Sequence, residues 1–167
     1  MKISFTGTHG TGKSTAVFDL AKQMKIENPN KTVGVFMENA KHSPLGFNKN
    51  RPKETQLWIF CNQLQSEITL STKYDIVITD RTVFDSIAYA YYFGFKDLAD
   101  VLFQTGYHFI HTYDKIIFKT IKNNNYLYSD GVRIVDDDEY RQGIENELII
   151  IYNKLKDLGA KFEFVIF

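Results

Sequence analysis

The chain has 167 residues, which fits one domain over residues 1–167, and its twenty basic and twenty acidic side chains give a formal net charge of zero. This balance argues against a general nucleic-acid or membrane surface, although a local basic patch is compatible with a neutral total. The single cysteine, Cys61, cannot form an internal disulfide, and there is neither a signal-like apolar core at the start nor a run of about 18 apolar residues, so we expect a cytoplasmic protein without a membrane span.

Residues 2–20 combine an apolar run, a glycine-rich loop and an amphipathic run. Ile3 and Phe5 alternate with polar residues and predict a strand, and apolar residues at helical spacing over 16–24 predict a helix. Between them, GTHGTGKS (7–14) fills the pattern G-x-x-x-x-G-K-[ST]. A strand and a helix on either side of this pattern are the setting in which it binds phosphate.

Each residue type in this loop has a chemical task. Glycines allow positive φ and close backbone approach, so that the N–H groups and the helix N-terminus converge on a polyphosphate. Lys13 reaches the outer phosphates and the Ser14 hydroxyl ligates Mg²⁺. We therefore expect a nucleoside triphosphate with Mg²⁺. The residues expected to bind the nucleotide are Gly7, His9, Gly10, Thr11, Gly12, Lys13, Ser14 and Thr15.

Two further strands are predicted to end in charged residues. Residues 32–37 read as a buried strand that ends at Glu38, and residues 74–79 as a central strand followed by Asp80 and Arg81. Ligands of open α/β sheets lie beyond the carboxyl ends of the strands, so Glu38 points at the phosphate cleft unless it merely faces solvent. Asp80 can hold Mg²⁺ opposite Ser14, and Arg81 can contact the transferring phosphoryl group or pair with Glu38 or Asp80.

The segment between these two strands is predicted to contain a long basic loop and a helix. Residues 40–53 have no apolar period, and Arg51 and Lys53 either meet an anionic substrate or are solvated. Residues 54–70 are predicted to be helical. The expected buried stripe is Leu57, Phe60, Cys61, Leu64 and Ile68. On the neighbouring face, Asn62, Gln63 or Gln65 is a less favoured candidate for reading a base edge.

A short helix is predicted over 82–93, with Thr82 as its cap and Asp85 in its first turn. Capping is a sufficient role for Asp85, but this carboxylate is also a candidate substrate-binding residue, with Glu38 and Arg81. Residues 96–104 are predicted to be helical and closed by Gly106. Residues 113–118 read as a fourth strand.

The polar, turn-rich residues 119–135 are a candidate lid, which would exclude water and bring cations to the phosphates. A plain surface loop is the alternative. The acidic run 136–139 then caps the longest helix, with Arg141 in its first turn, and residues 162–167 read as a fifth strand. Strands that alternate with helices predict an α/β fold with a doubly wound, mostly parallel five-stranded sheet.

These stretches resemble the P-loop kinases of the nucleoside and nucleotide kinase group, and the small AAA-type ATPase/kinase-like proteins of phages and bacteria. The resemblance rests on GTHGTGKS, Glu38, DRTVFD (80–85) and DGVR (130–133), and it covers nearly the whole chain. It implies that Glu38 or Asp80 is the general base and that Arg81 contacts the phosphoryl group. It further implies that Arg133 and Arg141 are lid arginines. This chain has Asp80 where deoxynucleoside kinases typically have Glu.

The hypothesis is ATP- and Mg²⁺-dependent phosphoryl transfer to a nucleoside, a nucleotide or a similar small acceptor, with Lys13, Glu38, Asp80, Arg81 and Arg133 as catalytic residues. One alternative is an NTP-hydrolysing switch that has no acceptor. Another is a kinase that acts on a hydroxyl in nucleic acid, which the neutral total charge disfavours. The acceptor and the oligomeric state stay open.

Overall fold

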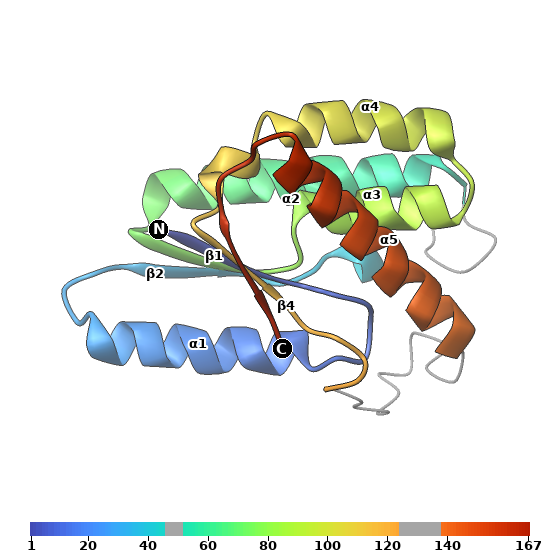
Figure 1. Cartoon of the computed structure of the whole chain (residues 1–167). Coiled ribbons are helices and arrows are strands. Elements are labelled where there is room, and N and C mark those ends of the chain that lie inside the picture. Colours follow the sequence, from blue (N-terminus) through green and yellow to red (C-terminus); the bar gives the residue numbers. More distant parts are fainter. Residues whose placement is uncertain (46–51, 124–137) are drawn as a thin grey trace.

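The computed structural model describes residues 1–45, 52–123 and 138–167, and its centre is a parallel sheet (Figure 1). The five strands are β1 (Lys2–Thr6), β2 (Val33–Phe36), β3 (Ile76–Asp80), β4 (Lys115–Phe118) and β5 (Glu163–Ile166). They are ordered β2-β3-β1-β4-β5, and every pair is parallel. The predicted doubly wound α/β fold is confirmed.

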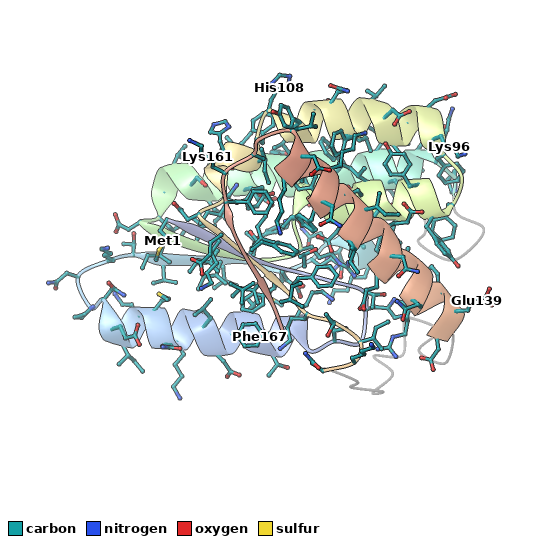
Figure 2. The ribbon with its side chains drawn as sticks, viewed as in Figure 1. Met1, Lys96, His108, Glu139, Lys161 and Phe167 are labelled. Atoms are coloured by element: carbon teal, nitrogen blue, oxygen red, sulfur yellow. The ribbon has the colours of Figure 1, made fainter. Side chains whose placement is uncertain are left out.

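Helices cover both faces of this sheet. They are α1 (Lys13–Glu27), α2 (Glu54–Lys73), α3 (Val83–Tyr92), α4 (Lys96–Tyr107) and α5 (Asp138–Asp157), with the short 3₁₀ helices η1 (Ala40–His42) and η2 (Ile110–Thr112). Figure 1 shows α1 on one face and α2, α3 and α4 on the other. The side chains drawn in Figure 2 fill the space between the sheet and these helices, and Lys96 and Glu139 mark the first turns of α4 and α5.

The chain leaves the two neighbouring strands β1 and β3 in opposite directions. From β1 it passes through α1 to the edge strand β2, whereas from β3 it passes through α3 and α4 to β4 on the other side of β1. Ligand sites of open α/β sheets lie at such a switch point, outside the carboxyl ends of the strands. The glycine-rich loop follows β1 and Asp80–Arg81 closes β3, so the fold brings both to this point.

Strand β1 is buried on both faces, although its sequence alternates apolar and polar residues. Ser4 and Thr6 are fully buried, and the apolar residues Ile3 and Phe5 are each only 5% exposed. The hydroxyl of Thr6 donates to Asp85 Oδ2 at 3.0 Å, so its polar group is satisfied inside the protein. The alternation in β1 therefore does not indicate a solvent-exposed face. Both faces of the strand are buried, one with apolar side chains and the other with polar, hydrogen-bonded side chains.

The predicted buried stripe of α2 is wrong for most of its members. Phe60 is buried, but Leu57 and Ile68 are 41% and 48% exposed, and Cys61 is exposed. The face that packs inward is mainly polar and consists of Thr55, Gln56, Phe60, Gln63 and Glu67. This face turns inward because groups beneath it need hydrogen-bonding partners, as the buried pair between Glu67 and Lys2 shows (Oε2 to Nζ, 2.8 Å).

Gly106 does not close α4, as the sequence suggested, because the helix continues to Tyr107. A Cβ at position 106 would lie 3.2 Å from the Phe84 ring and 3.4 Å from Ile87 Cδ1. The glycine therefore serves the close packing of α4 on α3.

Candidate active site

The phosphate loop has the backbone that its glycines were expected to allow. Gly7, Gly10 and Gly12 have φ values of 135°, 71° and 71°. Gly7 also lies against the chain that leaves β4, where a Cβ would come within 2.4 Å of Lys119 O. The loop therefore packs closely between β1 and the residue after β4, and it leads directly into the N-terminus of α1.

The Lys13 side chain folds back over the phosphate loop and contacts loop residues. Its Nζ donates to Thr8 O at 2.5 Å and lies 3.4 Å from Thr11 Oγ1. Burial and, to a smaller extent, the nearby Arg81 guanidinium lower the pKa of Lys13 to about 7, against the opposing effect of Asp80, Asp85 and Glu38. An ammonium held in this way is poised to exchange a carbonyl partner for phosphate oxygens.

Ser14 and Asp80 face each other across the loop. The Ser14 hydroxyl donates to Asp80 Oδ2 at 2.5 Å, and Asp80 is only 2% exposed. Its other oxygen, Oδ1, is buried and has no hydrogen-bond partner among the residues that the structure describes. A buried carboxylate oxygen without a donor, beside a hydroxyl, fits a Mg²⁺ ion.

No group of three His, Cys, Asp or Glu side chains in the described part of the chain could hold a metal ion by itself. Ser14 and Asp80 would therefore hold Mg²⁺ together with ligands from outside the protein, such as water and bound phosphate.

Arg81 occupies the centre of the site and has an unusual backbone. Its φ is 79°, in the left-handed region that costs a non-glycine residue about 1–2 kcal/mol. The guanidinium Nε lies 3.1 Å from Glu38 Oε2, and Nη1 donates to Asp85 Oδ1 at 3.0 Å and to Gly7 O at 3.3 Å. Burial alone would lower the pKa of Arg81, but Glu38, Tyr89 and Asp85 outweigh it and raise the pKa well above its ordinary value.

The arginine is thus permanently charged and joins the end of β2 to the phosphate loop. Its pairing with Glu38 is one of the options that the sequence left open for Arg81. The Glu38 side chain is 13% exposed, so it is partly accessible to solvent, and the ion pair with Arg81 orients its carboxylate.

Asp85 is a buried organiser of this cluster. It is 1% exposed, and its Oδ2 accepts from Thr6 Oγ1 at 3.0 Å and from the N–H and hydroxyl of Thr82 at 2.8 and 3.0 Å, while Oδ1 faces Arg81. The predicted capping role is confirmed as a complete capping box at the start of α3. A contact of Asp85 with substrate stays a prediction.

Aromatic rings form the wall beside Arg81. The Tyr89 ring centroid lies 5.3 Å from Arg81 Cζ, within cation–π range, and the Tyr140 ring packs against Tyr92 and against His9 of the phosphate loop, each at 5.3 Å. His9 is only 3% exposed. The loop residue His9 therefore points its ring at the first turn of α5.

Part of the predicted lid lies outside the described residues. Arg133 belongs to residues 124–137, and Arg51 of the basic loop belongs to 46–51. At the described start of the lid, Ile121 N donates to Glu145 Oε2 at 2.8 Å. Arg141 is fully buried, and its Nη1 lies 3.3 Å from Asp138 Oδ1. Lys53 is exposed directly before α2.

The sequence interpretation missed Gln56 on α2. This side chain is 1% exposed, and its Nε2 has no hydrogen-bond partner in residues 1–45, 52–123 and 138–167. On the same face, Glu67 meets Lys2 at the amino end of β1 and Gln63 donates to Arg81 O beyond β3. At 1.5 Å per residue, Gln56 is roughly 10 Å further along α2 than Gln63, in the direction away from Glu67. The spacing of Gln56, Phe60, Gln63 and Glu67 was a detectable signal, since it is itself a helical stripe.

Comparison with known proteins gives a family for this chain. The model of an AAA domain family matches residues 2–166. Because the match spans nearly the whole sequence, the chain belongs to this AAA domain family. A comparison with curated proteins found no match.

Solved kinases share the fold. A deoxyadenosine kinase from M. mycoides with bound dATP superposes with a TM-score of 0.63 at 17% identity, over 100% of this chain and 90% of that one. A thymidylate kinase from Ehrlichia chaffeensis gives a TM-score of 0.62 at 20% identity, over 100% of this chain and 91% of that one. The predicted resemblance to P-loop nucleoside and nucleotide kinases is confirmed at the level of the fold.

Proposed function

We propose that this protein is a kinase that transfers the γ-phosphoryl group of ATP, with Mg²⁺, to a nucleoside, a nucleotide or a similar small acceptor. The observation that carries the proposal is the position of Arg81, whose guanidinium contacts both Glu38 Oε2 (3.1 Å) and the phosphate-loop carbonyl of Gly7 (3.3 Å). One cation therefore spans the distance between a phosphate site and a carboxylate beside it. Such an arrangement suits transfer of a phosphoryl group from the loop to an acceptor near Glu38.

On the donor side, the loop N–H groups, Lys13 and Arg81 would bind the phosphates. Lys13 would leave Thr8 O for the β- and γ-phosphate oxygens, and Ser14 with Asp80 would hold Mg²⁺. When bound, the metal would supply positive charge beside the phosphates. Arg81 would stabilise the negative charge on the equatorial oxygens of the γ-phosphoryl group as its bond to ADP breaks.

On the acceptor side, we assign the general base to Glu38. Asp80 was the other candidate, but its Oδ2 already accepts from Ser14 and its Oδ1 suits the metal. Glu38 instead pairs with Arg81, whose guanidinium orients its carboxylate beside the phosphate loop. It can accept the acceptor's hydroxyl proton as the new P–O bond forms.

Gln56 would hydrogen-bond the acceptor. A buried amide N–H₂ without a partner among the described residues costs free energy unless a ligand or water accepts from it, and Gln56 shares the buried face of α2 with Gln63, which contacts Arg81. A nucleobase offers carbonyl and ring-nitrogen acceptors in one plane. The names of the structural neighbours, a deoxyadenosine kinase and a thymidylate kinase, support an acceptor of this kind.

Arg133 and Arg141 retain their proposed roles as lid arginines. Arg141 is buried at the start of α5, which is adjacent to the lid in sequence. Arg133→Ala should lower turnover far more than ATP affinity, because arginines that stabilise a transferring phosphoryl group act in the transition state. Unchanged turnover would remove Arg133 from the mechanism.

The proposal is tested by ADP release with ATP and Mg²⁺ across a panel of nucleosides, nucleotides and single-stranded DNA, with Lys13→Ala as the blank. We expect release only with a nucleoside or nucleotide, and Gln56→Leu should raise the KM for that acceptor while the KM for ATP is unchanged. Release that does not depend on an acceptor would instead indicate an NTP-hydrolysing switch. Release that requires DNA would indicate a nucleic-acid kinase.

In residues 1–45, 52–123 and 138–167, no helix combines the length and the apolar character that crossing a membrane requires.

A further inference from the structure

We propose that Gln63 is a positioning residue, which holds the Arg81 backbone in the left-handed conformation that aims its guanidinium at the phosphate loop. The inference rests on the proposed function for its effect on turnover, but its geometry is independent of the acceptor. The carboxamide of Gln63 donates from Nε2 to Arg81 O at 3.0 Å and to Glu67 Oε1 at 2.8 Å.

Arg81 needs such a restraint because its backbone is strained. A φ of 79° at a residue with a long side chain persists only where the surroundings hold it. The backbone is fixed at both ends of the residue, since Arg81 N donates to Phe5 O at 2.8 Å, and Arg81 O accepts from Gln63 and from Thr79 Oγ1 at 2.8 Å. If the carbonyl were released, rotation to negative φ would swing the side chain away from Gly7 and Glu38.

The carboxamide is well suited to this task because both of its hydrogens are used. An amide N–H₂ has two donors, and the contacts with Arg81 O and Glu67 Oε1 account for both. Gln63 is 4% exposed. Gln63 therefore has no Nε2 hydrogen left to donate to a base edge, which was the role considered for it from the sequence.

Glu67 fixes the orientation of Gln63 in turn. Glu67 is 1% exposed, and its second oxygen pairs with Lys2 Nζ at 2.8 Å. Lys2 Nζ also lies 3.9 Å from the centre of the Tyr113 ring. The support for Arg81 therefore extends along α2 to the amino end of β1, the opposite end of the sheet from the phosphate loop.

The test begins with Gln63→Met, which keeps the length of the side chain but removes both donors. Gln65→Met is the matched control, because Gln65 is exposed on the same helix outside its buried face, and the proposed function assigns the contact with the acceptor to Gln56 and not to Gln65. We expect Gln63→Met to lower kcat by roughly tenfold, with the KM for ATP within about twofold of wild type, and Gln65→Met to change neither. Thr79→Val removes the other donor to Arg81 O and should lower kcat in the same way, which covers the case that Gln63→Met does not fold.

A double-mutant cycle with Arg81→Ala separates positioning from a general loss of structure. If Gln63 acts through Arg81, Gln63→Met should cause no further loss of turnover in the Arg81→Ala background. An equal loss in both backgrounds, or a folded Gln63→Met protein with wild-type kcat, would overturn the proposal.

A readout without turnover keeps this inference separate from the proposed function. The side-chain Nε–Hε resonance of Arg81 in a ¹⁵N-labelled protein can be assigned by its loss in Arg81→Ala. We expect it to shift in Gln63→Met and not in Gln65→Met, whether or not any acceptor is phosphorylated. An unshifted resonance in Gln63→Met would refute the positioning role even if the protein proves to be a kinase.

Discussion

The two sides of the candidate site, which we call the phosphate wall and the acceptor wall after the proposed function, are built in different ways. The phosphate wall is a continuous stretch after β1, and its shape comes from backbone: three glycines with positive φ and the first turn of α1. The acceptor wall consists of side chains from α2, from α3 and from the residues that follow β2 and β3, which meet only when the sheet forms. Glu38, Arg81 and Asp85 are joined there by contacts of 3.1 and 3.0 Å.

Because of this difference, the two walls are sensitive to different kinds of mutation. A backbone cradle is sensitive to any added Cβ but tolerates many changes of side chain elsewhere. A cluster of buried charges depends on each member, because removing one leaves its partner charged and desolvated. Mutations should therefore affect the two walls in distinguishable ways.

The largest effect is expected at Arg81. Arg81→Ala should lower turnover by about 10³ to 10⁵, the range for arginines that stabilise a transferring phosphoryl group. Steady-state ADP release measures this, and urea unfolding monitors the stability lost with Glu38 and Asp85 left unpaired. Arg81→Lys keeps the positive charge but not the planar guanidinium with its several hydrogen-bond donors, and should recover only part of the activity. Near-normal turnover by folded Arg81→Ala would mean that the acceptor wall does not take part in the chemistry.

The remote support of the acceptor wall can be tested at Lys2. Lys2→Met leaves Glu67 buried without its cation, and should lower the free energy of unfolding by about 3–5 kcal/mol. The matched control is Lys115→Met, which breaks the exposed pair of Lys115 Nζ with Glu163 (2.7 Å; 33% and 58% exposed) and should cost at most about 1 kcal/mol. Equal losses in urea unfolding would contradict the claim that the buried network supports this wall.

The phosphate wall is tested at Gly7. Gly7→Ala places a Cβ within 2.4 Å of Lys119 O at a φ of 135°, and should cost roughly 2–3 kcal/mol and reduce ATP affinity. Gly94→Ala is the control, because φ there is 79° but, among the described residues and apart from its chain neighbours, no atom lies within 4 Å of the added Cβ, so only about 1 kcal/mol of backbone strain is expected. Thermal unfolding and ATP titration of both variants measure the difference, and similar values would show that the close approach to Lys119 is not needed.

The smallest effect concerns the protonation of Lys13. Burial and Arg81 lower the pKa of Lys13 to about 7 in the nucleotide-free protein, whereas bound phosphates favour the ammonium form. Lys13 is therefore largely neutral at pH 8 before binding and takes up a proton when ATP binds, and at pH 6 it is already charged. Calorimetry at pH 8 in buffers of different ionisation enthalpy should detect uptake approaching one proton. The uptake should be lost in Lys13→Met, and an uptake that persists there must come from another group.

The sequence was sufficient to predict the phosphate wall because all of its determinants are local. GTHGTGKS carries its own turn and helix start, and the neighbouring strands required only a regular α/β order. The convergence of Glu38, Asp80 and Arg81 followed from a general rule on strand ends. Their detailed pairing was left open, and the structure shows Arg81 with Glu38 and Asp85, and Asp80 with Ser14.

The face of α2 could not be predicted, because its orientation is decided by partners that are distant in sequence. Lys2 is 65 residues from Glu67, and Arg81 O is 18 residues from Gln63. Their need for hydrogen bonds in the interior exceeds the gain from burying Leu57 and Ile68, which apolar periodicity alone would place inside. The left-handed backbone of Arg81 could not be predicted either, because Arg has no intrinsic preference for positive φ and the groups that hold its carbonyl include one that is distant in sequence.

The outward face of α2 offers a practical handle for spectroscopy. Cys61 is the single cysteine of the chain, it is exposed, and it is two residues before Gln63 on the same helix. A maleimide dye can therefore be attached to the natural sequence at one defined position, without first removing other thiols. Fluorescence from that dye would report the binding of ATP and of each trial acceptor in the same sample, including ligands that bind without being phosphorylated.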